Sequence, residues 1–381
     1  MSGDHRRGLI SVDAALAWID SVVCRLGRED APLHEAAGRI LAEDIRAERP
    51  IPACDSASVD GFAVAAHETL GASSYNPLSL PLNEVASGDA LCGETDAVLP
   101  LDQGELDGAG HVVIVEALAP GVNVDKQGTV AAAGGLLIPA AALLGPQQIG
   151  ICAAAGISRL PVVRRPRVRI LLPQRTQSGA ADSNGPMLRS LIKRDGGIVS
   201  PCVAVGRSRS ALAEALAPAG SDIVLVVGGT GPGRDDEAAP ALAAAGELAI
   251  HGVALRPGET TGFGRIAGEA PVVLLPGSPP ACLWSYELFA GRAIRQFGGR
   301  DPRLPYSSRL ARTARKIVSS IGMTEICPVR CHPDGSVEPT VSFSEIGLMA
   351  AVNADGFVIV PETSEGYPSG APVNVYLYQD R

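Results

Sequence analysis

A glycine-rich turn between an apolar strand and a helix is the strongest candidate for chemistry in this sequence. The apolar run from Ile223 to Val227 leads into Gly228-Gly229-Thr230-Gly231-Pro232-Gly233, and helical periodicity resumes near Asp235. Glycines let the backbone adopt positive φ and approach a ligand closely, and a helix start offers unpaired N–H groups to an anion. The spacing matches neither a Walker loop nor the dinucleotide-binding pattern. We interpret the turn as an anion site, with a plain structural turn as the alternative.

A second turn of this kind ends the apolar segment PVVLLPG. Pro276, Gly277 and Ser278 precede a helix in which Pro279 suits the first position and Ser278 can act as the N-cap. Helix starts of this type are also common in purely structural roles. This turn is therefore a second candidate anion site, but its sequence alone does not distinguish an anion site from a structural helix start.

A carboxylate in a loop of small residues is the third candidate. Asp60 lies in CDSASVDGFAV, directly before a segment with β character. In isolation, an aspartate in such a loop is more often a turn residue than a catalytic one.

Three further features have simpler interpretations. Cys327, Cys331 and His332 suggest zinc, but the spacing is unusual and no second pair of ligands follows, so we do not predict a metal there. His251, next to Gly252, is interpreted as structural. Cys54 is interpreted as a small, partly buried residue rather than a reactive thiol.

Alternating strands and helices surround the glycine-rich turn. Strands are predicted at residues 167–172, 198–206, 223–227 and 271–277, and helices at 184–197, 208–220 and 279–297. This alternation predicts a parallel sheet with crossover helices. Such sheets bind ligands at the carboxyl ends of their strands.

The remaining segments predict other kinds of structure. A helix capped by Ser11 is expected near the N-terminus, a second at residues 33–45, and a third at PQQIGICAAAG. Short apolar runs between Phe62 and Ala119 predict a small β-rich domain, and short strands are expected from Tyr306 onward.

The composition restricts the class of protein. Hydrophobic residues make up 46% and charged residues 19% of 381 residues, an ordinary balance for a globular chain of several domains. The net charge of -9 argues against general binding of nucleic acid or anionic membranes. Eight scattered cysteines and the lack of a signal peptide or long apolar stretch indicate a cytoplasmic protein.

Taken in order, these motifs resemble one family. PIPACDSASVDGFAV is similar to the P…NSAMDGYAV loop of MoeA-type molybdenum insertases and the gephyrin E domain. VVGGTGPGRDD is similar to their SGG.S.G..D loop, LRPGETTGFG to their KPGKP..FG segment, and LLPGSPPA to their LPGNPVSA turn. LHEAAGRILAEDI, PQQIGICAAAGISRLPVVRRPRVRI and ADGFVIVPETSEGYPSGAPVNVYL match further hallmark segments. The resemblance runs from about residue 9 to the end of the chain.

The resemblance implies an α/β plus β fold of four domains. These are a helical and extended domain I (residues 9–45 and 128–165), a β-rich inserted domain II (46–127), a MogA-like three-layer α/β/α domain III with a mostly parallel sheet (166–303), and a C-terminal β domain IV (304–381). It also implies a homodimer whose cleft uses both subunits. The family inserts molybdate into adenylylated molybdopterin with Mg²⁺ and releases AMP.

The resemblance also implies roles for individual residues. Asp60 and Asp236 would be catalytic residues that place the metal ion and molybdate, and Arg256 would act with the glycine loop on phosphates. The expected residues for binding the pterin substrate are Gly228, Gly229, Thr230, Gly231, Gly233, Asp182, Asn184, Ser87, Pro276, Gly277, Ser278 and Arg330.

Several positions depart from the family pattern. Arg256 replaces the first lysine of KPGK and keeps its charge, whereas Glu259 replaces the second lysine and reverses it. The acidic TGDE segment is replaced by LLPQRTQSG, with Arg175 in place of carboxylates, and FSEIGLMAAV lacks the usual paired serines.

Two functions therefore follow from the sequence. The first is molybdenum insertase, with a MogA-type adenylyltransferase and molybdoenzyme acceptors as partners in addition to the second subunit. The alternative is a non-catalytic or specialised protein that binds molybdopterin or its cofactor without insertase turnover.

Overall fold

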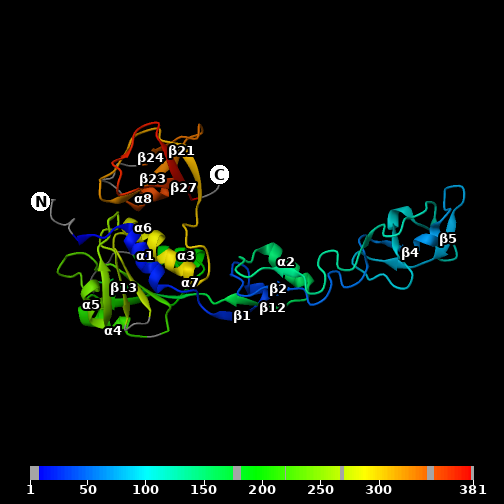
Figure 1. Cartoon of the computed structure of the whole chain (residues 1–381), viewed down its shortest axis with the longest axis horizontal. Coiled ribbons are helices and arrows are strands. Elements are labelled where there is room, and N and C mark those ends of the chain that lie inside the picture. Colours follow the sequence, from blue (N-terminus) through cyan, green and yellow to red (C-terminus); the bar gives the residue numbers. More distant parts are fainter. Residues whose placement is uncertain (1–7, 175–181, 219, 267–269, 341–346, 379–381) are drawn as a thin grey trace. The chain divides into compact units, whose positions relative to one another are not determined.

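The computed structural model describes residues 8–174, 182–218, 220–266, 270–340 and 347–378 (Figure 1). The chain divides into two compact units, one formed by Met1–Arg28 with Val163–Arg381 and the other by Glu29–Val162. Within the described residues, none of the helices is long and apolar enough to cross a membrane.

A seven-stranded sheet forms the centre of the first unit. Its strands are β13 (Arg167–Gln174), β14 (Ile198–Val199), β15 (Val203–Gly206), β16 (Ile223–Val227), β17 (Gly246–His251), β19 (Gly262–Ile266) and β20 (Pro271–Leu275). β14 and β15 both pair with β13, which pairs with β16, which in turn pairs with β20, all in parallel. β19 and β17 complete the sheet in antiparallel fashion. The predicted parallel sheet is thus a mixed, mostly parallel one.

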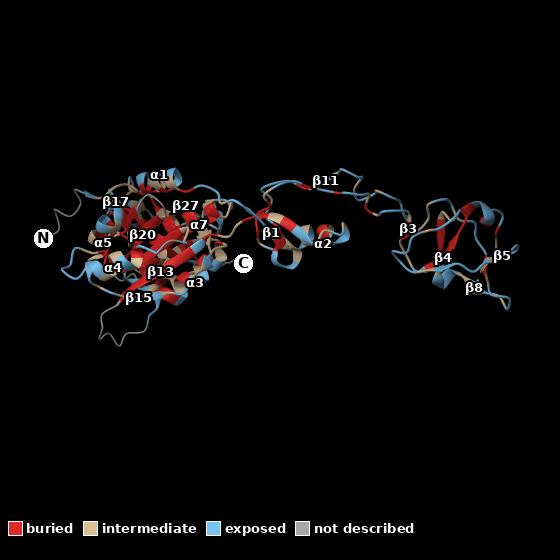
Figure 2. Ribbon diagram, turned by 90° about the horizontal axis from the view of Figure 1, so that it is seen from below, coloured by how far each residue is buried: buried red, intermediate tan, exposed pale blue. Residues whose placement is uncertain are grey.

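The central strands β13, β16 and β20 are buried on both faces because helices cover both sides of the sheet. Val168, Ile170 and Leu225 belong to one apolar core, and Val224 and Val226 belong to a second core on the opposite face. Successive side chains of a strand point to opposite faces, so the uninterrupted apolar run of β16 supplies both cores. Figure 2 shows β13 and β20 buried along most of their length. This is the predicted three-layer arrangement.

The helices begin near the positions that the sequence indicates. They are α1 (Val12–Val22), α3 (Asn184–Arg194), α4 (Arg209–Leu216), α5 (Ala238–Ala245), α6 (Pro279–Ser285), the π-helical turn η5 (Tyr286–Ala290) and α7 (Gly291–Phe297). The hydroxyl of Ser11 accepts a hydrogen bond from the amide of Ala14 at 3.1 Å, which confirms the predicted cap of α1. α5 begins at Ala238, three residues beyond the expected position.

A β sheet follows in the C-terminal part of the chain, drawn in orange and red in Figure 1. Its strands from this part are β21 (Ser307–Arg312), β23 (Thr324–Cys331), β24 (Val337–Pro339), β25 (Gly356–Val360) and β27 (Pro372–Leu377). The same part of the chain contains the helix α8 (Leu348–Val352) and a separate pair of short strands, β22 (Ile317–Val318) and β26 (Gly366–Tyr367). One edge strand, β18 (Leu255–Arg256), comes from much earlier in the chain and pairs with β23 in parallel. The segment that contains Arg256 is therefore attached to the C-terminal sheet.

The second unit consists of short strands and one α-helix. Its elements are β1 (Arg28–Pro32), η2 (Leu33–Glu35), β2 (Ile45–Arg46), β3 (Ser56–Ala57), β4 (Gly61–Val64), η3 (Ala66–Thr69), β5 (Leu78–Pro81), β6 (Glu84–Val85), β7 (Ala97–Pro100), η4 (Leu101–Gln103), β8 (Glu105–Leu106), β9 (His111–Ile114), β10 (Val124–Asp125), β11 (Leu136–Ile138), α2 (Pro146–Ala154) and β12 (Arg159–Val163). α2 and the β-rich segment agree with the prediction.

The helix predicted over residues 33–45 is wrong. A single turn, η2, forms there and ends at Glu35. Gly38 has φ of 74°, which a right-handed helix does not allow. Its amide donates to the carbonyl of Leu144 at 2.7 Å, and Leu41 is buried in a core with Leu160. The apolar residues that suggested a helical face are instead part of an irregular segment, and they are buried in this core.

Candidate functional site

The two candidate turns meet at the carboxyl ends of β16 and β20. Gly228 and Gly229 have φ of 92° and 67°, as expected for a turn that requires glycine. A β-carbon on Gly277 would lie 3.2 Å from the Cα of Gly228. The two backbones are therefore close enough that a side chain on Gly277 would push the turns apart.

A cavity of about 430 Å³ opens beside these turns. It is lined by Arg207, Gly228, Gly229, Thr230, Gly231, Asp236, Pro257, Gly258, Glu259, Thr260, Pro276, Gly277, Ser278 and Ala281. The structure thus brings both turns, Asp236 and the segment around Glu259 to one site. The glycine-rich turn borders an open cavity and is not sealed under side chains.

The amides of the turns supply the donors of this site. Among the described residues, none accepts a hydrogen bond from the amides of Gly229, Thr230, Gly231 or Gly277. The amide of Ala238, at the start of α5, donates to the carbonyl of Gly229 at 2.9 Å. The first amide of α5 is therefore already paired, and the candidate donors at the cavity are those of the glycine turn itself. Unpaired amides beside a cavity favour an anion.

Thr230 is held in place by two polar contacts. His251 Nε2 lies 2.9 Å from the carbonyl oxygen of Thr230, and because a carbonyl can only accept, this ring nitrogen carries the proton. The hydroxyls of Thr230 and Thr260 lie 2.9 Å apart. His251, interpreted from the sequence as structural, thus supports the glycine turn.

Asp236 folds back onto the turn. Its Oδ2 accepts a hydrogen bond from the amide of Gly233 at 3.1 Å, and a β-carbon on Gly231 would lie 2.7 Å from the same oxygen. This contact closes the turn ahead of α5 and explains why the helix begins later than expected. It also places one carboxylate at the wall of the cavity.

The start of α3 lies against the second turn. Asp182 Oδ1 accepts a hydrogen bond from the amide of Gly185 at 3.0 Å, and Asn184 Nδ2 donates to the carbonyl of Gly277 at 2.9 Å. Asn184 Oδ1 is buried, and none of the described residues donates to it. The structure thus connects Asn184, a predicted site residue, to the Gly277 turn.

Arg256 does not line the cavity. Its Nε lies 3.1 Å from Glu259 Oε1 and its Nη1 lies 3.1 Å from Glu325 Oε1. Glu325 is 1% exposed. The guanidinium of Arg256, which was expected to bind phosphates, is therefore paired with two carboxylates. One of them belongs to Glu259, the residue that departs from the family pattern.

Arg207 is a site residue that sequence reasoning missed. It follows β15 directly and lines the cavity, and its Nε is buried with no acceptor among the described residues. The sequence signal that could have identified Arg207 was its position in the chain. It is the first residue after a strand predicted for a parallel sheet, where ligands meet the carboxyl ends of strands.

Asp60 and Ser87 lie together in the second unit. Asp60 Oδ1 accepts a hydrogen bond from the amide of Ser87 at 2.7 Å, and the hydroxyl of Ser87 donates to the carbonyl of Ser58 at 3.1 Å. Both residues are exposed. The structure thus joins two residues that the sequence singled out separately.

Arg330 is exposed on β23, opposite Glu338 of β24, and does not line the 430 Å³ cavity.

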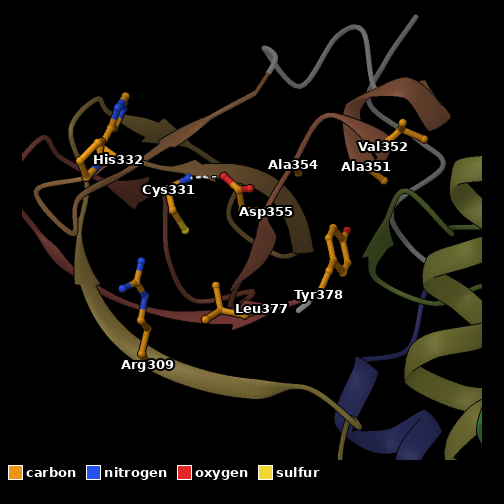
Figure 3. A pocket seen from close by; sticks show the side chains of 10 residues that line it. Arg309, Cys331, His332, Ala351, Val352, Ala354, Asp355, Leu377 and Tyr378 are labelled. Carbon is orange, nitrogen blue, oxygen red and sulfur yellow. Dashed lines mark hydrogen bonds between the residues drawn. The ribbon is translucent and has the colours of Figure 1, made fainter. Parts of the chain in front are cut away.

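A second cavity, of about 520 Å³, lies in this C-terminal region and is lined by Cys331 and His332 among others. In Figure 3 the thiol of Cys331 and the ring of His332 point in different directions. Burial raises the pKa of the Cys327 thiol to about 12.

Two predicted departures fall on residues outside the described part of the chain: Arg175, and the first four residues, 343–346, of the FSEIGLMAAV segment. Among the residues that are described, no group of three or more His, Cys, Asp or Glu side chains is placed to hold a metal ion.

Comparison with known proteins connects the three parts of the chain. Models of the MoeA N-terminal region (domain I and II), a probable molybdopterin binding domain and the MoeA C-terminal region (domain IV) match residues 10–156, 169–296 and 310–378 in turn. The cavity lies in the part matched by the second of these models.

Individual relatives match over nearly the full length. Molybdopterin molybdenumtransferase 2 of Mycobacterium tuberculosis is 26% identical, covering 91% of this chain and 94% of its own length. A molybdopterin biosynthesis protein of Methanocaldococcus jannaschii is 28% identical, covering 92% of each chain. The crystal structure of the MoeA protein from Pyrococcus horikosii superposes with a TM-score of 0.75 at 28% identity, covering 98% of this chain and all of that one. The chain is a divergent member of the MoeA-type molybdopterin molybdenumtransferase family.

Proposed function

We propose that this protein inserts molybdate into adenylylated molybdopterin and releases AMP, as an enzyme of molybdenum cofactor biosynthesis in the cytoplasm. The observation that carries the proposal is a cavity in the region matched by the molybdopterin-binding model, bordered by four amides from which none of the described residues accepts a hydrogen bond. The substrate contributes two phosphate groups and molybdate contributes a further anion. Backbone amides that border one cavity would provide fixed donors for such groups without reorganisation.

Magnesium fits the donors at this site. Mg²⁺ is commonly held by one or two carboxylates together with substrate phosphates and water. Asp236 provides one carboxylate at the cavity wall. When bound there, the ion would offset the negative charge of the phosphates and of molybdate. The carboxylate of Asp236 would hold the ion, and the amides of the glycine turn would orient the phosphates.

The homodimer remains part of this proposal. We propose that Asp60 serves the cavity from the second subunit, because a β-rich inserted domain that completes the partner's cleft is what the family resemblance implies. Asp60 exposes its carboxylate next to Ser87, which suits a residue that meets a ligand outside its own unit. The MogA-type adenylyltransferase and molybdoenzymes remain proposed partners.

A second function is favoured by one observation. The cation of Arg256 is engaged by Glu259 and Glu325 and not directed at the cavity. A site with fewer available cations binds the pterin phosphate without necessarily stabilising the charge that develops during molybdate insertion. The alternative is thus a protein that binds molybdopterin or its cofactor without turnover.

Single-turnover assays separate the two functions. Purified protein is mixed with adenylylated molybdopterin, molybdate and Mg²⁺, and AMP release and molybdenum cofactor formation are measured. Molybdate-dependent AMP release, lost in Asp60→Asn, would support the insertase. Binding of molybdopterin without AMP release, together with failure to complement an insertase-deficient strain, would establish the binding protein instead. Absence of both binding and turnover would overturn both functions.

A further inference from the structure

The charges around the cavity are unevenly available to a ligand. Among the described residues that line it, Arg207 is the one with a cationic side chain, and Asp236 and Glu259 are the two with carboxylates. Glu259 uses both oxygens within the protein, one toward Arg256 Nε and the other toward the amide of Gly258, each at 3.1 Å. Its negative charge is therefore largely balanced by Arg256.

Arg207 stands in the opposite situation. Its Nε is buried, and none of the described residues accepts a hydrogen bond from it. Neither an ion pair nor a hydrogen bond connects its guanidinium to any described carboxylate. A buried donor without an acceptor costs about 1–3 kcal/mol, more when it is charged. Such a cost is retained most readily where a ligand removes it.

The position of Arg207 in the sheet lets it act together with the glycine turn. β15 and β16 pair with β13 on its two sides, so Arg207 and Gly228 emerge from strands two positions apart. Two strand spacings correspond to about 10 Å, which an extended arginine side chain spans in large part. Arg207 and the unpartnered amides therefore border the same cavity from different sides.

We propose that Arg207 is the principal cationic contact for a phosphate group of the ligand and that Glu259 keeps Arg256 out of this role. The proposal rests on the proposed function, since it names the residue that recognises the phosphate ester of the pterin. A guanidinium binds phosphate through paired N–H donors. The turn amides would bind the remaining phosphate oxygens. Among the described residues, the proposed site thus has one cationic side chain available to the ligand. This side chain follows β15 and does not belong to the KPGK-type segment.

A matched pair of charge-removing variants tests this role. Arg207→Gln removes the cation at the cavity. Arg209→Gln removes an equal charge two residues away, from a largely exposed side chain that pairs with Glu237 and does not line the cavity. The affinity for molybdopterin is measured by titration calorimetry at low and high salt, and thermal unfolding is followed in parallel. A third variant, Arg207→Lys, keeps the charge but not the paired donors.

We expect Arg207→Gln to weaken molybdopterin binding by about tenfold to hundredfold and to reduce its salt dependence. Arg209→Gln should leave the affinity within about twofold of the parent, and Arg207→Lys should fall between. The melting temperature should stay constant or rise in Arg207→Gln, because an unpaired donor is removed. An unchanged affinity in Arg207→Gln would overturn the proposal while leaving the proposed function standing.

Inorganic pyrophosphate provides the second arm. If the parent protein binds no molybdopterin, the proposed function fails, and pyrophosphate binding decides the role of Arg207 separately. Pyrophosphate bound by the parent and lost in Arg207→Gln would retain Arg207 as a phosphate contact. Pyrophosphate that binds neither protein, or both equally, would overturn it.

Discussion

Arg256 Nη1 donates a hydrogen bond to Glu325 Oε1 at 3.1 Å, and this contact joins β18 to the buried interior of the C-terminal sheet. Glu325 is 1% exposed and its Oε1 also accepts from the amide of Ser320 at 3.3 Å. Glu259, at the position of the second lysine in the family pattern, contacts the same guanidinium, with its Oε1 3.1 Å from Arg256 Nε. Arg256 is neutralised from two sides and acts as a structural cation.

Removal of Arg256 should therefore destabilise the fold. Arg256→Gln leaves Glu325 buried without its counter-ion, which should lower the free energy of unfolding by about 2–4 kcal/mol. Urea denaturation measures the change. The double variant Arg256→Gln with Glu325→Gln should recover at least half of the loss, because the uncompensated charge is gone. Additive losses in the double variant would show that the two side chains are not coupled.

Asp60 should be needed for activity and not for stability. Its carboxylate is exposed and accepts one hydrogen bond from the amide of Ser87. Water can replace that acceptor in Asp60→Ala, so the loss in stability should stay within about 1 kcal/mol. AMP release should nevertheless be abolished. Calorimetric melting and the turnover assay are compared, and Asp60→Asn serves as the control that keeps an acceptor but removes the charge. A large loss of stability would identify Asp60 as a turn residue.

The close approach of the two turns predicts a binding defect in Gly277→Ala. The added methyl group would lie 3.2 Å from the Cα of Gly228, closer than ordinary van der Waals contact. We expect the turns to separate by a few tenths of an ångström and the affinity for molybdopterin to fall. The free energy of unfolding should change by about 1–2 kcal/mol. Gly108→Ala is a control for expression and handling, since its β-carbon position is open and its φ is not positive. Parent-like affinity in Gly277→Ala would show that the spacing of the turns does not shape the site.

Acid should weaken the attachment of α1 to α7 through Asp20. Hydrogen bonds from Arg292 are the largest cause that lowers the pKa of Asp20 below its ordinary value of 3.8, and one from Gln296 adds to them. A carboxyl group whose folded pKa is depressed contributes stability above its unfolded pKa and loses it as the pH falls through the folded value. The stability difference between the parent and Asp20→Asn should therefore be full at neutral pH and shrink below about pH 4. Urea titrations at several pH values measure it, and a difference independent of pH would contradict the assigned ion pair.

Local patterns in the sequence were sufficient for much of the fold and for the core of the site. The apolar run of β16, the glycines after it and the cap at Ser11 each depend on neighbouring residues, so periodicity and turn chemistry predict them. The same reasoning failed at residues 33–45. Gly38 there adopts a positive φ, and contacts with Leu144, more than one hundred positions away, hold the segment outside a helix.

The partners of the charged and polar site residues were decided by tertiary structure. Glu325 contacts Arg256 because β18 pairs with a strand about seventy residues further along the chain. Ser87 contacts Asp60 because the chain of the inserted β segment turns back on itself. Arg207 is left without a partner for the same reason, since no carboxylate of another described element reaches it. Sequence spacing determines which residues can share a turn or a helix face. Which charges meet across strands depends on strand order and register, which are set by the packing of the whole sheet.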